Sequence, residues 1–240
     1  MDVRHMEQLI HAMLFNGRAE PVGGGSSTVL RASTSAPKLG ALCGASKPTQ
    51  RGGRNMERER LGLAVVPVAA VGWSTEDIQN VAREAEAGGF EAIFATEVNN
   101  DAMATAQLMG AATERIQVGT WVANVYLRHP YVCAQGAALI AASTGGRFIL
   151  GLGVSHQPVN GALKVDMSNA GEHVRQYTAD VQAWLRGEGP ATHLPQMPAP
   201  RKVPVYVAAI TSRMVEQAAE RADGIMPIFW SPDRVRQSKT

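Results

Sequence analysis

The sequence is poor in cysteine and has no long hydrophobic run. Only two cysteines, Cys43 and Cys133, occur in 240 residues, and the stretches around them differ strongly in character. A disulfide framework is therefore not expected, and a reducing cytoplasm is the predicted compartment. A membrane-spanning helix needs about 20 consecutive apolar residues. No stretch of this sequence reaches that length, so we expect no membrane association.

A strong charge imbalance and metal-binding patterns are missing as well. The 23 basic and 21 acidic residues leave a net charge of +2, and no basic stripe with interleaved aromatic residues stands out. Nucleic-acid binding therefore has little support. His, Cys and Asp do not recur at the spacings of a metal site, so we predict no metal. The composition, with 45% hydrophobic and 18% charged residues, is typical of a soluble globular protein.

Residues 1–55 differ in character from the rest of the chain. They contain small, polar and aperiodic stretches such as Gly23–Thr28 and Gln50–Arg54. Such stretches cannot bury enough apolar surface to offset the entropy lost on ordering, so we predict a disordered N-terminal extension. An Arg- and Ser-rich, acid-poor start is also typical of an organelle transit peptide. We favour a third interpretation, in which translation begins at Met56 and the start codon has been assigned too far upstream.

Beyond Arg60, six apolar runs alternate with stretches of helical periodicity. The repeat of roughly 30 residues is typical of right-handed βαβ crossovers. The runs are apolar throughout, so the sheet should be parallel and covered by helices. A doubly wound open sheet and a TIM barrel both fit this pattern. The predicted strands lie at residues 61–68, 90–96, 116–125, 148–150, 203–210 and 223–229.

Local signals mark where several helices begin. Ser74–Asp77 has the pattern of a capping box, and Pro130 suits a first helical position because proline lacks an N–H. Thr211 or Ser212 is expected to cap the helix that follows the fifth strand. Residues 157–168 are predicted to form a longer loop before the next helix.

The stretch Gly145–His156 predicts a buried strand that begins after a glycine turn and ends in a glycine-rich mouth. Gly151 and Gly153 leave the end of this strand without side chains, so a ligand can approach the backbone closely. Ser155 and His156 then place a hydroxyl and an imidazole at the rim. A plain strand followed by a turn is the alternative.

The position of this glycine-rich run favours a barrel over a dinucleotide-binding sheet. Such a sheet carries Gly-x-Gly-x-x-Gly in its first strand-to-helix turn, whereas the run here follows the fourth strand and lacks the third glycine. A TIM barrel instead collects its ligand chemistry at the C-terminal ends of several strands. The candidate residues at such ends are Glu97, Asn124, His156, Thr211 and Trp230.

Four motifs follow one another along the chain: Glu114–Thr120, Arg128–Pro130, Gly145–Gly153 and Ala219–Ile225. Together they resemble the luciferase-like monooxygenase superfamily, over about residues 61–234. Within that superfamily, Thr96–Glu97 with Asp101 and the stretches 153–156 and 173–177 are most similar to the branch that uses the deazaflavin coenzyme F420. The FMN-dependent branch is the nearby alternative.

The resemblance implies an α/β fold of the TIM (β/α)8 type, of which residues 60–240 supply about six βα units and lack the last strands. It implies a flavin-type cofactor in the C-terminal mouth and an oxidoreductase that transfers a hydride between coenzyme F420 and a small organic substrate. An FMN-dependent monooxygenase is the first alternative. The second is an inactive truncated barrel that acts as a subunit or interaction module, and a homodimer also stays open.

The resemblance further implies roles for particular residues. Glu97 and His156 match positions of catalytic residues, although Val98 replaces the histidine that often follows the acid. An imidazole suits proton transfer because its unperturbed pKa lies near ~6.5. A non-prolyl cis peptide bulge corresponds to Trp121 and Val122, where the family has smaller residues than Trp. The other residues expected to line the cofactor are Asn124, Gly153, Val154, Ser155, Ala208, Ala209, Ile210 and Thr211.

Overall fold

The computed structural model describes residues 62–66, 73–98, 100–188 and 202–228, together with Ser231 and Asp233. All of them belong to one of the two units into which the chain divides, residues 54–240. The predicted N-terminal extension, residues 1–55, lies outside the described residues, and so does Trp230.

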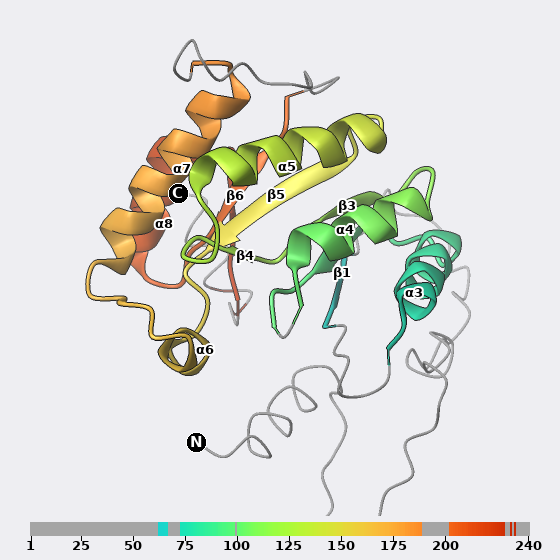
Figure 1. Ribbon diagram of the computed structural model, residues 1–240, viewed down its shortest axis with the longest axis horizontal. Coiled ribbons are helices and arrows are strands. Elements are labelled where there is room, and N and C mark those ends of the chain that lie inside the picture. Colours follow the sequence, from blue (N-terminus) through green and yellow to red (C-terminus); the bar gives the residue numbers. More distant parts are fainter. Residues whose placement is uncertain are drawn as a thin grey trace, which may run out of the picture. The chain divides into compact units, whose positions relative to one another are not determined.

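Short strands alternate with helices along the described part of the chain, as the sequence pattern predicts (Figure 1). None of the described helices is long and apolar enough to cross a membrane. The strands are β1 (Gly62–Val65), β2 (Ala92–Ala95), β3 (Gln117–Thr120), β4 (Ala123–Asn124), β5 (Phe148–Gly153), β6 (Val205–Ala208) and β7 (Gly224–Met226). The helices are α3 (Thr75–Ala87), α4 (Ala102–Ala111), α5 (Pro130–Ser143), α6 (Gln157–Ala162), α7 (Ala170–Leu185) and α8 (Ser212–Arg221).

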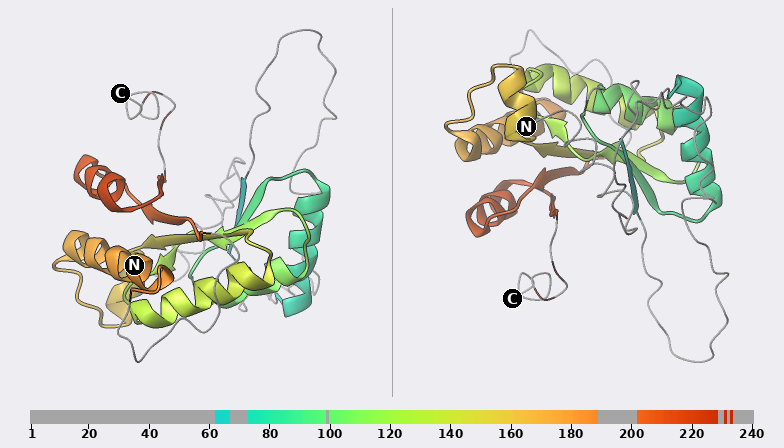
Figure 2. Two further views of the ribbon diagram at one scale, coloured as in Figure 1. Left: turned by 90° about the horizontal axis from the view of Figure 1, so that it is seen from above. Right: turned by 90° about the horizontal axis from the view of Figure 1, so that it is seen from below.

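The strands form a parallel sheet whose order follows the chain, β1-β2-β3-β5-β6-β7, with β4 also paired to β5. The helices lie along one face of this curved sheet, as the two views of Figure 2 show. A doubly wound sheet would carry helices on both faces and a reversal in its strand order. The arrangement is therefore that of a half-barrel, and the predicted barrel-type fold is confirmed.

Local signals that the sequence predicts mark the beginnings of three helices, α3, α5 and α8. Ser74 Oγ accepts a hydrogen bond from the N–H of Asp77 at 3.1 Å, while the N–H of Ser74 donates to Asp77 Oδ2 at 2.8 Å. Helix α5 begins at Pro130. Of the two candidates at α8, Thr211 is the cap, because its Oγ1 accepts from the N–H of Met214 at 3.3 Å.

The prediction of a loop over residues 157–168 is wrong, because this stretch contains helix α6. Asn160 and Gly161 have poor helix propensity, and six residues are too few to show an amphipathic period. The tertiary contacts of Asn160, which is fully buried, support the helix instead. One of these contacts comes from Asn124, 36 residues away in the sequence, so the local pattern could not indicate it.

The predicted third strand, residues 116–125, is divided into β3 and β4 by a cis peptide bond between Trp121 and Val122. The bulge that the family resemblance implies is therefore present. At the interruption the hydroxyl of Thr120 takes the place of the backbone hydrogen bonds that would otherwise pair this strand with β5. It donates to the carbonyl of Gly151 at 2.7 Å and accepts from the N–H of Gly151 at 3.0 Å. Thr120 thus satisfies both backbone polar groups of Gly151 in the interior.

Candidate functional site

The predicted site residues lie where neighbouring parallel strands end. Asn124 at the end of β4 is in register with Gly153 at the end of β5. Ala208 at the end of β6 is in register with Met226 of β7, and Glu97 follows β2 closely. The C-terminal strand ends therefore meet at one edge of the half-barrel, where barrel folds collect their ligand chemistry.

Glu97 is a buried carboxylate, with its side chain only 5% exposed. Arg128 contacts both of its oxygens: Nη2 donates to Oε1 at 2.5 Å and Nη1 donates to Oε2 at 3.0 Å. The backbone N–H groups of Asn124 and Ala102 also donate to the carboxylate. Two-point contacts of this kind are among the stronger hydrogen-bonded pairs in proteins. Glu97 therefore joins the end of β2 to the end of β4, to the start of α4 and to the segment before α5.

Arg128 is the centre of the charged part of the site. Besides pairing with Glu97, its Nη2 lies 3.2 Å from Asp101 Oδ1, and its carbonyl accepts from the hydroxyl of Tyr177 at 3.0 Å. Burial alone would lower the pKa of Arg128, but the hydrogen bonds and charge of Glu97 and the charge of Asp101 raise it. The guanidinium therefore keeps its charge and neutralises the buried carboxylate.

Asp101 caps helix α4 beside this pair. Its Oδ1 accepts from the N–H of Ala104 at 3.1 Å and from the N–H of Met103 at 2.8 Å. Burial raises the pKa of Asp101, but the Ala104 bond, the charge of Arg128 and the Met103 bond together lower it below its usual value. A lowered carboxyl pKa stabilises the fold at pH values above the unfolded-state pKa. This contribution is lost as the pH falls through the folded-state pKa, so acid should loosen the cluster.

Two buried asparagines connect the end of β4 to the loop after β5. Asn124 Nδ2 donates to Asn160 Oδ1 at 2.8 Å, and Asn160 Nδ2 donates to the carbonyl of Val154 at 2.6 Å. Asn124 Oδ1 accepts from the N–H of Tyr126 at 3.1 Å. The amide of Asn124, a residue expected to line the cofactor, is thus engaged with the protein at both of its polar atoms.

Two of the predicted cofactor-lining residues, Val122 and Ala208, lie close to a third, Gly153. A Cβ atom added to Gly153 would lie 2.4 Å from Val122 Cγ2 and 3.1 Å from Ala208 Cβ. At Gly151 the added atom would lie 2.1 Å from the carbonyl oxygen of Thr120. Packing within the half-barrel therefore requires both glycines. Val122 and Ala208 are each partly exposed, and we call the surface that they form over Gly153 the apolar wall.

The predicted rim residues differ in exposure. His156 is exposed, and its imidazole forms no capping bond although the residue precedes α6. Ser155 is half-buried and has a left-handed φ of 60°. Ile210 is 52% exposed, whereas Ala209 is fully buried. Of the two residues predicted to be catalytic, Glu97 and His156, only His156 presents its side chain to solvent.

Aromatic rings pack on either side of the interrupted strand. Trp121 meets Phe94 edge-on, with ring centroids 6.4 Å apart. Tyr126 stacks on His173 of α7, with centroids 4.4 Å apart and planes inclined by 3°. Within the described part of the chain, the hydroxyl of Tyr126 is buried without a hydrogen-bond partner. Burial, and then the charge of Asp166, raises the pKa of Tyr126, so the phenol remains protonated and able to donate.

Sequence reasoning missed Arg128 and Asn160 as site residues. Arg128 contacts Glu97 across 31 residues of sequence, and no local pattern indicates that pairing. Its one signal is its place in a family motif, two residues before the helix start at Pro130. Asn160 lies in the stretch that is predicted to be a loop and has no signal of its own.

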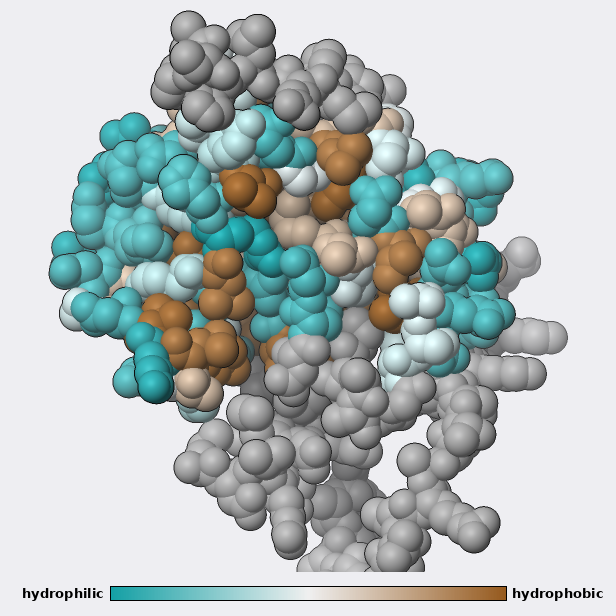
Figure 3. Space-filling model, in the orientation of Figure 1, coloured by the Kyte–Doolittle hydropathy of each residue, from teal (hydrophilic) through white to brown (hydrophobic). Residues whose placement is uncertain are grey.

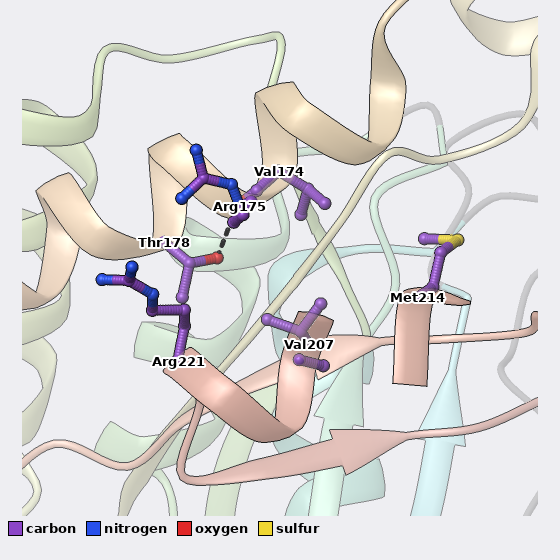
Figure 4. A pocket seen from close by; sticks show the side chains of 7 residues that line it. Val174, Arg175, Thr178, Val207, Met214 and Arg221 are labelled. Carbon is purple, nitrogen blue, oxygen red and sulfur yellow. Dashed lines mark hydrogen bonds between the residues drawn. The ribbon is translucent and has the colours of Figure 1, made fainter. Parts of the chain in front are cut away.

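A small hollow lies between α7 and α8, and Val207 of β6 also lines it (Figure 4). Its volume of about 10 Å³ is close to what a single water molecule needs, so a ring cofactor does not fit. No group of His, Cys, Asp or Glu among the described residues is arranged to hold a metal ion. The residues that line the hollow are Val174, Arg175, Thr178, Val207, Met214, Ala218 and Arg221.

Comparison with known proteins gives a family for this arrangement. The sequence model of the family described as luciferase-like monooxygenase matches residues 57–238. A relative from Mycobacterium tuberculosis, named as a candidate coenzyme F420-dependent oxidoreductase, is 32% identical over 191 residues, which cover 67% of this chain and 54% of the relative. The chain spans about half the length of the curated relatives that it matches.

Solved structures share the fold. The coenzyme F420-dependent tetrahydromethanopterin reductase of Methanopyrus kandleri is 22% identical, with a TM-score of 0.58 over 70% of this chain and 55% of that chain. The oxygenating constituent of 3,6-diketocamphane monooxygenase from Pseudomonas putida, solved in complex with FMN, is 15% identical, with a TM-score of 0.61 over 75% and 60%. At these identities the likeness shows the fold alone.

We predict that removing the partner of Glu97 destabilises the fold strongly. Arg128→Met leaves a buried carboxylate without its counter-charge, which should cost about 3–5 kcal/mol of unfolding free energy. Adding Glu97→Gln removes that charge, so the double variant should recover much of the loss. Urea unfolding of the wild type, Arg128→Met, Glu97→Gln and the double variant measures the coupling energy between Glu97 and Arg128.

The matched control is Arg175→Met, which breaks the exposed pair between Arg175 and Glu172. This change should cost far less than Arg128→Met, because solvent-exposed ion pairs contribute little. Additive losses at Glu97 and Arg128, with a coupling below about 0.5 kcal/mol, would show that these two residues do not act as a unit.

Proposed function

Because the chain belongs to the luciferase-like monooxygenase family, we propose that it is an oxidoreductase that transfers a hydride between coenzyme F420 and a small organic substrate. The observation that carries the proposal is the apolar wall, where Val122 and Ala208 both lie close to Gly153, the last residue of β5. The relative from Mycobacterium tuberculosis, with its F420-dependent name, supports the choice of coenzyme.

The residues at the strand ends fit a flat ring with polar edges. The apolar wall offers a partly exposed surface without a bulky side chain at its centre, and half-exposed Val154 and Ser155 follow it directly in the chain. When bound, the deazaflavin would supply the hydride chemistry, and the protein would supply position and electrostatics. The residues proposed to hold it are Trp121, Val122, Asn124, Gly153, Val154, Ser155, Ala208, Ala209, Ile210 and Thr211.

The two predicted catalytic residues would contribute in different ways. His156 is exposed at the rim, and its imidazole can both accept and donate a proton, so we propose that it moves the proton that accompanies hydride transfer. Both carboxylate oxygens of Glu97 already accept hydrogen bonds from Arg128. We therefore propose that Glu97 contributes mainly by holding the backbone of Asn124.

The buried thiol of Cys133 supports a cytoplasmic location for this activity. Cys133 is a free cysteine with no solvent exposure. A protein whose described part holds an unpaired thiol of this kind suits a reducing compartment.

An FMN-dependent monooxygenase is the second candidate function. The Pseudomonas putida structure, which contains FMN, aligns with 75% of this chain. A flavin ring has a similar flat shape, so the same apolar wall would receive it. The two candidates differ in the cofactor that binds, and binding can be measured directly.

We predict that the full-length chain binds coenzyme F420 with a micromolar dissociation constant and binds FMN at least tenfold more weakly. Fluorescence quenching during titration with each cofactor measures both constants. Ala208→Leu should weaken F420 binding at least tenfold, because the larger side chain would extend over the apolar wall. Ala87→Leu, an exposed position on α3, is the matched control and should leave binding unchanged.

Each other outcome has a definite meaning. Binding of FMN alone would move the assignment to the monooxygenase. If neither cofactor binds while the chain still unfolds cooperatively, both enzyme assignments are contradicted. The chain is then better explained as an inactive barrel that acts as a subunit or interaction module.

We also propose that two copies of the chain associate through the outer face of α4 and α5. Neither helix contains a charged residue, although 18% of the chain is charged. Val132 and Leu139 of α5 are 56% and 50% exposed, and Figure 3 shows pale and brown surface over these helices. A helix that is apolar all round is normally covered, and a two-fold copy would bring the same neutral face to meet it.

This proposal predicts that the wild-type chain is a dimer at micromolar concentration and that Leu139→Glu weakens association at least tenfold. The reason is that a two-fold axis would bury two like charges near each other. Analytical ultracentrifugation measures the association. Leu163→Glu, which changes a leucine of similar exposure, 53%, is the control and should remain dimeric. A monomeric wild-type chain, or equal effects of the two variants, would contradict the interface.

A further inference from the structure

Asn160 is a buried polar side chain with a partner for each of its polar atoms. It is 0% exposed, although most residues of the short helix α6 are exposed or half-exposed. Its Oδ1 accepts from Asn124 Nδ2 at 2.8 Å, and its Nδ2 donates to the carbonyl of Val154 at 2.6 Å and to Met167 Sδ at 3.1 Å. Burying an amide is unfavourable unless such bonds are formed, so these contacts determine where α6 can lie.

The neighbouring bonds fix the orientation of both asparagine amides. The N–H of Tyr126 can only donate, so the Asn124 atom that faces it at 3.1 Å must be the oxygen. The amino group of Asn124 then requires the oxygen of Asn160, and the amino group of Asn160 faces the carbonyl of Val154. This relay has one direction, from Tyr126 to Val154, and flipping either amide would break its bonds.

The relay ends on the loop that leads from β5 to α6. Asn160 bonds the carbonyl of Val154 through its side chain and the carbonyl of His156 through its N–H, at 3.0 Å. Between these two anchors Ser155 has a φ of 60°, a left-handed conformation that is uncommon for residues other than glycine. Asn160 therefore holds the loop on both sides of Ser155.

We propose that Asn160 is a positioning residue, which holds the loop Val154–His156 so that Ser155 and His156 face a cofactor at the strand ends. As far as the cofactor is concerned, the inference rests on the proposed function. The conformation of the loop, in contrast, can be measured on the free protein. Asn160 itself would touch neither cofactor nor substrate.

Two substitutions of Asn160 separate the bonds of its amide. Asn160→Leu keeps a similar volume but neither donates nor accepts. Asn160→Asp, when ionised, accepts from Asn124 but places a negative charge against the carbonyl of Val154. When protonated, the introduced carboxyl donates to that carbonyl as the amide does. Gly161→Ala on the same helix is the matched control, because nothing lies within 4 Å of the added Cβ.

Hydrogen–deuterium exchange of the full-length chain tests the effect on the loop without any cofactor. Relative to the wild type at the same pH, Asn160→Leu should exchange at least tenfold faster over residues 154–168, with β1, β2 and β3 unchanged. Asn160→Asp should exchange fast at pH 8 and approach the wild type near pH 5, because burial raises a carboxyl pKa. Gly161→Ala should match the wild type. Wild-type exchange in Asn160→Leu would overturn the proposal.

Cofactor titration then tests the positioning role, using whichever of F420 and FMN binds the wild-type chain. The dissociation constant should rise at least tenfold in Asn160→Leu and in Asn160→Asp at pH 8, and the latter should recover at pH 5. Unchanged affinity despite a loosened loop would overturn the positioning role. If the wild type binds neither cofactor, the proposed function fails, while the exchange rates still decide whether Asn160 holds the loop.

Discussion

The buried carboxylate of Glu97 imposes the strictest requirement on this edge of the half-barrel. A carboxylate that is 5% exposed is unfavourable by several kcal/mol unless it is paired and hydrogen-bonded. Arg128 supplies a two-point contact, and the N–H groups of Asn124 and Ala102 complete the set of donors. These partners come from different segments of the chain. Meeting the needs of one side chain therefore fixes the ends of β2 and β4 together with the starts of α4 and α5.

The backbone of Asn124, which Glu97 holds, in turn fixes residues at the predicted cofactor site. Asn124, held through its N–H, orients Asn160, which in turn holds the carbonyl of Val154. The apolar wall lies beside this relay, because Asn124 and Gly153 are in register across β4 and β5. A cofactor would then meet groups that already have their positions, and such pre-organisation is what a protein contributes to a redox cofactor.

Much of the fold could be predicted from the sequence, because its signals are local. The capping box at Ser74 and the proline at residue 130 mark helix starts through contacts within a few residues, and uniformly apolar runs indicate a parallel sheet. The strand ends could also be predicted, since barrels place their chemistry there. The pairing of Glu97 with Arg128 and the helix around Asn160 could not, because both depend on contacts across about 30 residues or more. Gly151 and Gly153 are predicted to admit a ligand to the backbone, but the structure shows that packing within the half-barrel requires them as well.

We infer that the protein's own polar contacts hold the strand ends before any cofactor arrives. Residue-resolved amide hydrogen exchange, measured by NMR with and without cofactor, tests this inference most directly at two N–H groups. The N–H of Asn124 donates to the carboxylate of Glu97, and the N–H of Tyr126 donates to the side-chain oxygen of Asn124. We expect both amides to exchange slowly in the free protein and their exchange rates to change less than threefold when the cofactor binds. Fast exchange in the free protein, with protection appearing only when the cofactor binds, would contradict it.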